Sequence, residues 1–213
     1  MFAQSNDPVG LGHVASMARP GGNITGFTFI DLSLIGKWLQ FLADIAPAVT
    51  RCALLFNPDT TPYYLPYLSS IDASPSSPLE LKGAPVRSAA ELEGVIQTIA
   101  RDGNGSLISP AGPFNVVHSR RIAQLAEQLR LPAISIYSQF AADGGLMAYG
   151  PDTRDIFRRS AHYVDRILKG ESPADLPVQA PTKYIFSINL KVARMFGLNA
   201  PPLLVSLADE VIE

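Results

Sequence analysis

The stretch RCALLFNPD, residues 51–59, decides the fold class. Residues 51–56 form a short and nearly continuous apolar run, which is typical of a strand that is covered on both faces. Residues 57–59 follow this run directly and have the composition of a turn. A strand that is buried on both faces predicts a parallel sheet between two layers of helices.

Helices and further short strands alternate on both sides of this stretch. The helix expected over residues 31–46 carries one apolar stripe, formed by Ile35, Trp38, Leu39, Leu42 and Ile45. Further helices are expected over 62–73, behind a capping box at 88–91, over 115–130 and 153–169, from 189 to about 197, and once more in the tail. Further strands are expected over 23–27, 79–86, 105–109, 132–137, 145–149 and 184–188. This alternation predicts an α/β fold in which helices flank parallel sheets.

The composition excludes several classes of protein. The 213 residues are 47% hydrophobic and 17% charged, with a formal charge of −2, so the chain has too much apolar material to stay disordered. The lone Cys52 excludes a disulfide scaffold, and no apolar run reaches the ~18–20 residues that span a bilayer. The slightly negative charge argues against a nucleic-acid partner.

Signatures of enzymes are scarce in this sequence. His13, His118 and His162 lie far apart, so none has a partner at metal-ligand spacing. The glycine-rich segment 18–23 lacks the residues of a phosphate-binding loop, and no G-x-S-x-G motif is present. The sequence therefore predicts a protein that is not an enzyme and that uses no cofactor.

Candidate binding residues follow the predicted strands, because ligands of parallel α/β sheets bind beyond the carboxyl ends of the strands. Asn57 can donate to and accept from a polar ligand, or its side chain can form an Asx turn. Asp152 can cap the helix that begins at 153, pair with a ligand ammonium, or do both. Tyr137 and Tyr149 are candidates for an aromatic wall, with core packing as the alternative, and Ser109 completes this set.

Eight stretches carry a resemblance to a known family. They are DPVGLG (7–12), ARPGGNITG (18–26), FNPD (56–59), GGLMAYGPD (144–152), YVDRILKG (163–170), PADLPV (173–178), INLK (188–191) and ADEVI (208–212). In their number and order they resemble the ABC-transporter substrate-binding protein family, which includes tryptophan- and phenylalanine-binding receptors.

The resemblance implies a type 1 periplasmic-binding-protein fold, in which two α/β lobes close on a ligand by a hinge motion. On this interpretation residues 1–27 and 150–213 form an incomplete first lobe, and residues 28–149 form the second lobe with the interlobe crossings. Asp7 and Thr25 are then the candidate ligand contacts from the first lobe. Two complete lobes would need roughly 250–300 residues, so we expect an N-terminally truncated receptor.

The implied function is that of a solute-binding component of an ABC importer. It would bind a small organic molecule, for example an aromatic or branched amino acid, in an interlobe cleft, and its partner would be a membrane permease. Its location would be the periplasm or a lipoprotein anchor, although residues 1–7 show no export signal. The uncovered helix faces of an incomplete lobe would favour a homo-dimer.

Two alternative functions come from other classes of protein. The chain could be a truncated, non-binding α/β remnant that only oligomerises. An α/β enzyme, such as a small hydrolase or a flavodoxin-like protein, would need a nucleophile–base pair or a phosphate-binding loop, and the sequence has neither.

Overall fold

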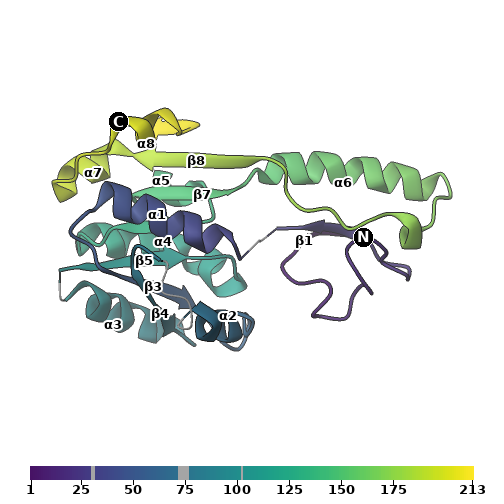
Figure 1. The fold of residues 1–213 in the computed structure, drawn as a ribbon, viewed down its shortest axis with the longest axis horizontal. Helices are drawn as coiled ribbons and strands as arrows, with labels where there is room; N and C mark the ends of the chain where they lie inside the picture. Colours follow the sequence, from purple (N-terminus) through teal and green to yellow (C-terminus); the bar gives the residue numbers. More distant parts are fainter. Residues whose placement is uncertain (30–31, 72–76, 102) are drawn as a thin grey trace. The chain divides into compact units, whose positions relative to one another are not determined.

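The computed structural model describes residues 1–29, 32–71, 77–101 and 103–213. The chain divides into two compact units. Unit 1 comprises residues 1–31 and 151–184, and unit 2 comprises residues 32–150 and 185–213. Figure 1 shows the helices and strands of each unit.

Unit 2 contains a seven-stranded sheet in the order β4-β3-β5-β6-β7-β8-β9. Its strands are β3 (Arg51–Phe56), β4 (Glu80–Pro85), β5 (Gly105–Ser109), β6 (Ala133–Ser135), β7 (Met147–Pro151), β8 (Tyr184–Asn189) and β9 (Glu210–Ile212). The stretch that decides the fold, β3, lies between β4 and β5 and is parallel to both. Its last five residues are buried, as expected for an inner strand of a parallel sheet.

Helices cover both faces of this sheet. They are α1 (Leu34–Ile45), α2 (Tyr64–Ile71), α3 (Ala89–Ala100), α4 (Pro113–Gln128), α5 (Gln139–Ala142), α7 (Leu190–Phe196) and α8 (Pro202–Ser206). On one face, Leu55 of β3 and Leu107 of β5 belong to a core with residues of α3, α4 and α5. On the other face, a Cβ at Gly83 of β4 would meet Leu68 of α2. The α/β fold with a parallel sheet between helices is therefore confirmed.

Unit 1 is built from two short parallel strands and one long helix. β1 (Phe2–Ser5) pairs with β2 (Gly26–Thr28), and Phe27 of β2 also forms a bridge with Gln179 on its other side. The helix α6 (Thr153–Leu168) packs against both strands, and a 3-10 helix, η1 (Pro173–Asp175), follows it.

Most element positions agree with the sequence analysis, and three kinds of detail differ. β1, β9 and the short helix α5 were not predicted. At the predicted capping box, Glu91 accepts hydrogen bonds from the Arg87 amide and the Ser88 hydroxyl, but Ser88 makes no cap bond in return. Residues 185–213 lie in unit 2, because β8 and β9 extend its sheet, whereas the sequence interpretation placed them in the first lobe.

Two predicted segments fall partly outside the described residues, namely the start of the helix over 31–46 and the end of the helix over 62–73. Among the residues that the structure does describe, no helix has the length and apolar character needed to cross a membrane.

Candidate functional site

Three of the predicted residues come together at the carboxyl edge of the sheet in unit 2. Asn57, Ser109 and Tyr137 stand at or just beyond the ends of β3, β5 and β6, which are adjacent strands. We call these residues, with Thr61, Tyr63, Tyr64, Asn115 and the backbone of 111–112, the strand-end cluster. Parallel strands end at the same edge of a sheet, which is why residues that are distant in the sequence meet there.

Asn57 forms the Asx turn that was one of its two predicted roles. Its Oδ1 accepts from the Asp59 amide at 2.8 Å, and its Nδ2 donates to the Arg87 carbonyl at 3.2 Å. Its backbone carbonyl accepts from the Thr61 hydroxyl at 2.7 Å. The side chain therefore holds the loop after β3 in place, and contact with a ligand stays a prediction.

Asn115, in the first turn of α4, ties the ends of β3 and β5 to each other. Its buried Nδ2 donates to the Leu55 carbonyl at 2.8 Å and to the Ser109 hydroxyl at 3.1 Å. The Ser109 carbonyl accepts in turn from the Ser135 hydroxyl of β6 at 3.0 Å. These bonds fix the spacing of three strand ends, so the edge of the sheet is preorganised.

Tyrosine rings form the apolar part of the strand-end cluster. Tyr64 is fully buried and donates to the Ala111 carbonyl at 2.9 Å, and its ring lies 4.7 Å from that of Tyr63. Burial raises the pKa of Tyr137 to about 12, although the Gly112 amide, which donates to the Tyr137 hydroxyl, opposes that shift. Burial also raises the pKa of Tyr64. Both phenols are therefore neutral at physiological pH, and Tyr63 and Tyr137 are partly exposed.

Tyr149 makes its ring contacts in another part of unit 2. Its ring meets those of Phe41 and Phe186 edge-on, at 5.4 and 6.2 Å, and its carbonyl accepts from the Trp38 indole at 2.8 Å. Burial and the nearby charge of Asp209 raise its pKa. These contacts correspond to the packing alternative that the sequence left open for this residue.

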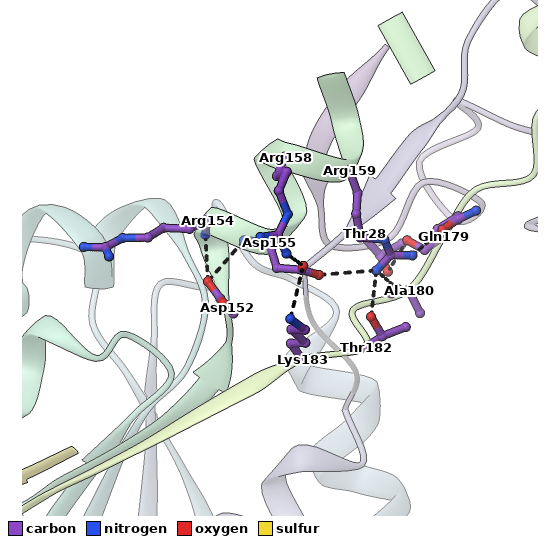
Figure 2. Close-up of polar contacts among 10 residues, drawn as sticks. All are labelled: Thr28, Asp152, Arg154, Asp155, Arg158, Arg159, Gln179, Ala180, Thr182 and Lys183. Atoms are coloured by element: carbon purple, nitrogen blue, oxygen red, sulfur yellow. Dashed lines mark hydrogen bonds and ion pairs between the residues drawn. The ribbon is translucent and has the colours of Figure 1, made fainter. Parts of the chain in front are cut away.

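The other three predicted residues belong to unit 1, where each forms hydrogen bonds within that unit. Asp152 is the N-cap of α6, and its Oδ1 accepts from the amides of Arg154 and Asp155 at 2.9 and 3.1 Å (Figure 2). Thr25 is buried and donates to the Leu176 carbonyl at 2.5 Å. Asp7 accepts from the Gly10 amide at 2.8 Å.

A charged network lies beside Asp152 and joins α6 to the segment that follows η1. The buried carboxylate of Asp155 pairs with Arg158, with Arg159 at 3.8 Å and with Lys183 at 4.0 Å (Figure 2). Arg159 also donates to Gln179 and, at 3.0 Å, to the Thr182 hydroxyl. We interpret these bonds as structural, because each donor and acceptor has a partner within unit 1.

Two cavities in unit 2 lie away from the strand-end cluster. One, of about 220 Å³, is lined by Phe41, Asp44 and residues of 201–207. The other, of about 260 Å³, lies at the amino ends of β3 and β5 beside α3. Neither is lined by a predicted site residue. Within residues 1–29, 32–71, 77–101 and 103–213, no three His, Cys, Asp or Glu side chains are grouped so that they could hold a metal ion.

The sequence analysis did not predict four residues of the strand-end cluster, namely Thr61, Tyr63, Tyr64 and Asn115. Thr61, Tyr63 and Tyr64 stand at the start of a helix that the periodicity indicated only weakly, and Asn115 stands in the first turn of another. The adjacent aromatic pair at 63–64, just after the turn at 57–59, was the signal available in the sequence.

Known proteins resemble this chain along nearly its whole length. The sequence model of a family described as "ABC transporter substrate binding protein" matches residues 1–212. A "Tyrosine-binding protein" of Clostridioides difficile (strain R20291) is 23% identical over 207 residues, which are 96% of this chain and 59% of that relative. The chain thus spans less than two thirds of the length of this curated relative.

Solved structures share the fold at low sequence identity. A conserved domain protein from Vibrio cholerae O1 biovar El Tor str. N16961 matches 97% of this chain and 69% of its own, with a TM-score of 0.85 and 23% identity. An "ABC domain in complex with L-Trp" from "Streptococcus pneumonia" matches 99% of this chain and 70% of its own, with a TM-score of 0.87 and 20% identity. Because the family model matches almost every residue, this chain belongs to the ABC transporter substrate binding protein family.

Proposed function

We propose that this protein is the solute-binding component of an ABC importer and that its ligand is an aromatic amino acid. The observation that carries the proposal is the convergence of Asn57, Ser109 and Tyr137 at one edge of the sheet in unit 2. Such an edge is where ligands of parallel α/β sheets bind. The named ligands of two relatives, tyrosine and L-Trp, support an aromatic side chain.

The chemistry of the strand-end cluster fits the aromatic part of such a ligand. Tyr63 and Tyr137 are partly exposed, so their rings can stack on a planar side chain, and the raised pKa of Tyr137 keeps its phenol neutral. The Asp59 carboxylate and the Arg87 guanidinium lie 3.6 Å apart beside Asn57, and both are well exposed. They are candidates for the ammonium and carboxylate groups of an amino acid.

The finer parts of the proposal follow from the family. The protein acts by binding alone and presents its ligand to a membrane permease. It works in the periplasm, free or held by a lipid anchor. Asp7, Thr25, Tyr149 and Asp152 stay predictions as ligand contacts, as does the interlobe cleft implied by the resemblance. A second copy of the chain is a further proposed partner.

Calorimetric titration of the full chain with L-Tyr, L-Trp, L-Phe and L-Leu tests the ligand class. We expect saturable binding of the three aromatic amino acids and weaker binding of leucine. Tyr137→Ala should weaken aromatic binding about two- to twelvefold, because one aromatic contact contributes about 0.5–1.5 kcal/mol.

Tyr67→Ala is the matched control, because Tyr67 is partly exposed on α2 and lies outside the strand-end cluster. A folded chain that binds none of the four amino acids would overturn the proposal and would favour the alternative of a non-binding α/β remnant. Equal losses in Tyr137→Ala and Tyr67→Ala would show that the ligand lies elsewhere.

A further inference from the structure

Two buried side chains of the strand-end cluster, Ser109 and Asn115, each have one hydrogen-bonding group that no described residue meets. Asn115 Nδ2 donates to the Leu55 carbonyl and to the Ser109 hydroxyl, at 2.8 and 3.1 Å, which fixes the orientation of the amide. No described residue donates to Asn115 Oδ1, and none accepts from the Ser109 hydroxyl. Asn115 is 2% exposed and Ser109 is 1% exposed, and a buried polar group without a partner is costly.

Asn115 Oδ1 is within reach of a small molecule. In the described part of the chain, the side-chain oxygen and nitrogen atoms that are fully buried without a partner belong to Ser119 and Ser160. Asn115 Oδ1 is not one of them, so part of its surface is open to solvent. A Cβ at Gly112 would lie 4.0 Å from Asn115 Oδ1 and 3.0 Å from Thr61 Cγ2. Glycine at 112 therefore keeps the space beside Oδ1 clear.

The two groups are close enough to bond to one ligand atom. The Ser109 hydroxyl oxygen lies 3.1 Å from Asn115 Nδ2, and the nitrogen and oxygen of one amide are about 2.3 Å apart. The Ser109 hydroxyl oxygen and Asn115 Oδ1 therefore lie within about 5.4 Å of each other. A hydrogen bond between two oxygen atoms is about 2.7–2.8 Å long, so a single ligand oxygen can bond to both.

A hydroxyl is the ligand group that satisfies both side chains. Asn115 Oδ1 needs a donor and the Ser109 hydroxyl needs an acceptor, and a hydroxyl group is both. An indole N–H only donates, and a phenyl ring does neither. The charged groups of an amino acid have a better place beside Asp59 and Arg87, whose side chains are 64% and 61% exposed, because a charge is costly to bury without a charged partner. This leaves Ser109 and Asn115 for the aromatic end of the ligand.

We propose that Ser109 and Asn115 bind a hydroxyl group on the aromatic ring of the ligand and so select tyrosine over phenylalanine. The ligand hydroxyl donates a hydrogen bond to Asn115 Oδ1, and its oxygen accepts one from the Ser109 hydroxyl. This selectivity rests on the proposed function, which does not rank the aromatic amino acids. Asn115 then has two roles, because its Nδ2 ties the ends of β3 and β5 together while its Oδ1 contacts the ligand.

Phenylalanine binds more weakly, because its ring buries both groups without partners. Each buried polar group that is left unpaired lowers an affinity about fivefold or more, so L-Tyr should bind about thirtyfold or more tightly than L-Phe. A site that bonds to a ligand hydroxyl also rejects the analogue without it more strongly than an apolar site rejects a missing methylene group. L-Trp should meet Asn115 Oδ1 through its indole N–H and should not need the Ser109 hydroxyl.

Calorimetric titration of the full chain and of Ser109→Ala with L-Tyr, L-Phe and L-Trp tests this proposal. The measured quantity is the ratio of the L-Tyr affinity to the L-Phe affinity, which a general loss of stability would not change. Ser109→Ala should lower this ratio about fivefold or more, because it removes a bond to L-Tyr and an unpaired donor beside L-Phe. It should not weaken the binding of L-Trp. Asn115→Ala should lower the ratio as well, but it also removes the bond to the Leu55 carbonyl, so Ser109→Ala is the decisive variant.

Ser106→Ala is the matched control for Ser109→Ala. Ser106 is fully buried near the amino end of the same strand, β5, where its hydroxyl donates to the Arg51 carbonyl at 3.0 Å. Its removal should leave the affinity ratio unchanged. Equal affinities of the unaltered chain for L-Tyr and L-Phe, a ratio that Ser109→Ala does not change, or an equal fall in Ser106→Ala would overturn the selectivity and leave the aromatic ligand standing. A folded chain that binds none of the three amino acids would overturn both.

Discussion

The two units of this protein hold themselves together by different means. Unit 2 has a seven-stranded sheet between helices, and its largest side chains, including Trp38, Phe56 and Phe140, are fully buried. Unit 1 has two short strands and one long helix, and a buried carboxylate with three basic partners joins the helix to the segment 179–183. A two-stranded sheet is marginal without further packing. The comparison teaches that unit 2 depends mainly on apolar burial, whereas unit 1 adds a network of charged bonds to a smaller set of buried apolar side chains, which includes Phe27, Ile156 and Leu176.

The largest effect is expected from Trp38→Ala in unit 2. Trp38 is fully buried on α1, and its indole donates to the Tyr149 carbonyl at 2.8 Å. Removing such a side chain from a core costs about 3–5 kcal/mol of unfolding free energy. Urea unfolding followed by far-UV circular dichroism measures this loss.

Trp38→Phe is the control for this variant, because it keeps most of the apolar volume and removes the indole hydrogen bond. It should cost about 1–2 kcal/mol. If both variants lower the unfolding free energy by less than about 1 kcal/mol, the core of unit 2 does not depend on α1, and the comparison between the units is wrong.

A smaller effect is expected from alkaline pH, through the buried Cys52 thiol of unit 2. Burial raises the pKa of the Cys52 thiol from 9.0 to about 12, against the weaker opposing effects of Ser106 and Ile108. Between these two values the unfolded chain releases the thiol proton and the folded chain retains it. The free energy of unfolding therefore falls by about 1.4 kcal/mol for each pH unit above 9.

Cys52→Ala lacks this contribution, so its unfolding free energy should fall less steeply above pH 9. Denaturant titrations at pH 8 and pH 10.5 measure the difference, which should reach about 2 kcal/mol. The buried tyrosines also ionise in the unfolded chain above their ordinary pKa, but they contribute alike to both proteins. Equal slopes would mean that solvent reaches the thiol in the folded state.

The sequence predicted unit 2 better than unit 1, for a physical reason. The apolar run 51–56 indicates a buried strand, so β3 could be predicted, as could β5. Because the strands are parallel, the edge where Asn57 and Ser109 lie could be predicted as well. β1 and β9 could not, because they are four and three residues long and only partly buried, and so show no clear period. Their positions depend on pairing with β2 and β8, which are distant in sequence.

The same distinction applies to the side chains of the candidate site. Asn57 and Tyr137 were predicted from their positions just after strands. Those positions could not show that the side-chain amide of Asn57 already forms hydrogen bonds with the backbone of Asp59 and Arg87. Asn115 was missed because its role is to bridge two strands, and such a role follows from tertiary contacts that no local pattern encodes.

The smallest effect is expected at Asp152, where the cap of α6 lies in unit 1. Asp152→Ala removes the acceptor of the Arg154 and Asp155 amides, and loss of an N-cap costs about 1 kcal/mol. Asp152→Asn keeps an acceptor oxygen and removes the charge, so it should retain most of that stability. Hydrogen exchange should quicken at the amides of 154 and 155 in the alanine variant and stay unchanged in the sheet of unit 2. Quickened exchange across unit 2 would contradict the separation of the two units. The asparagine variant also separates the two predicted roles of this carboxylate, because a ligand ammonium needs the charge whereas the cap needs only the oxygen.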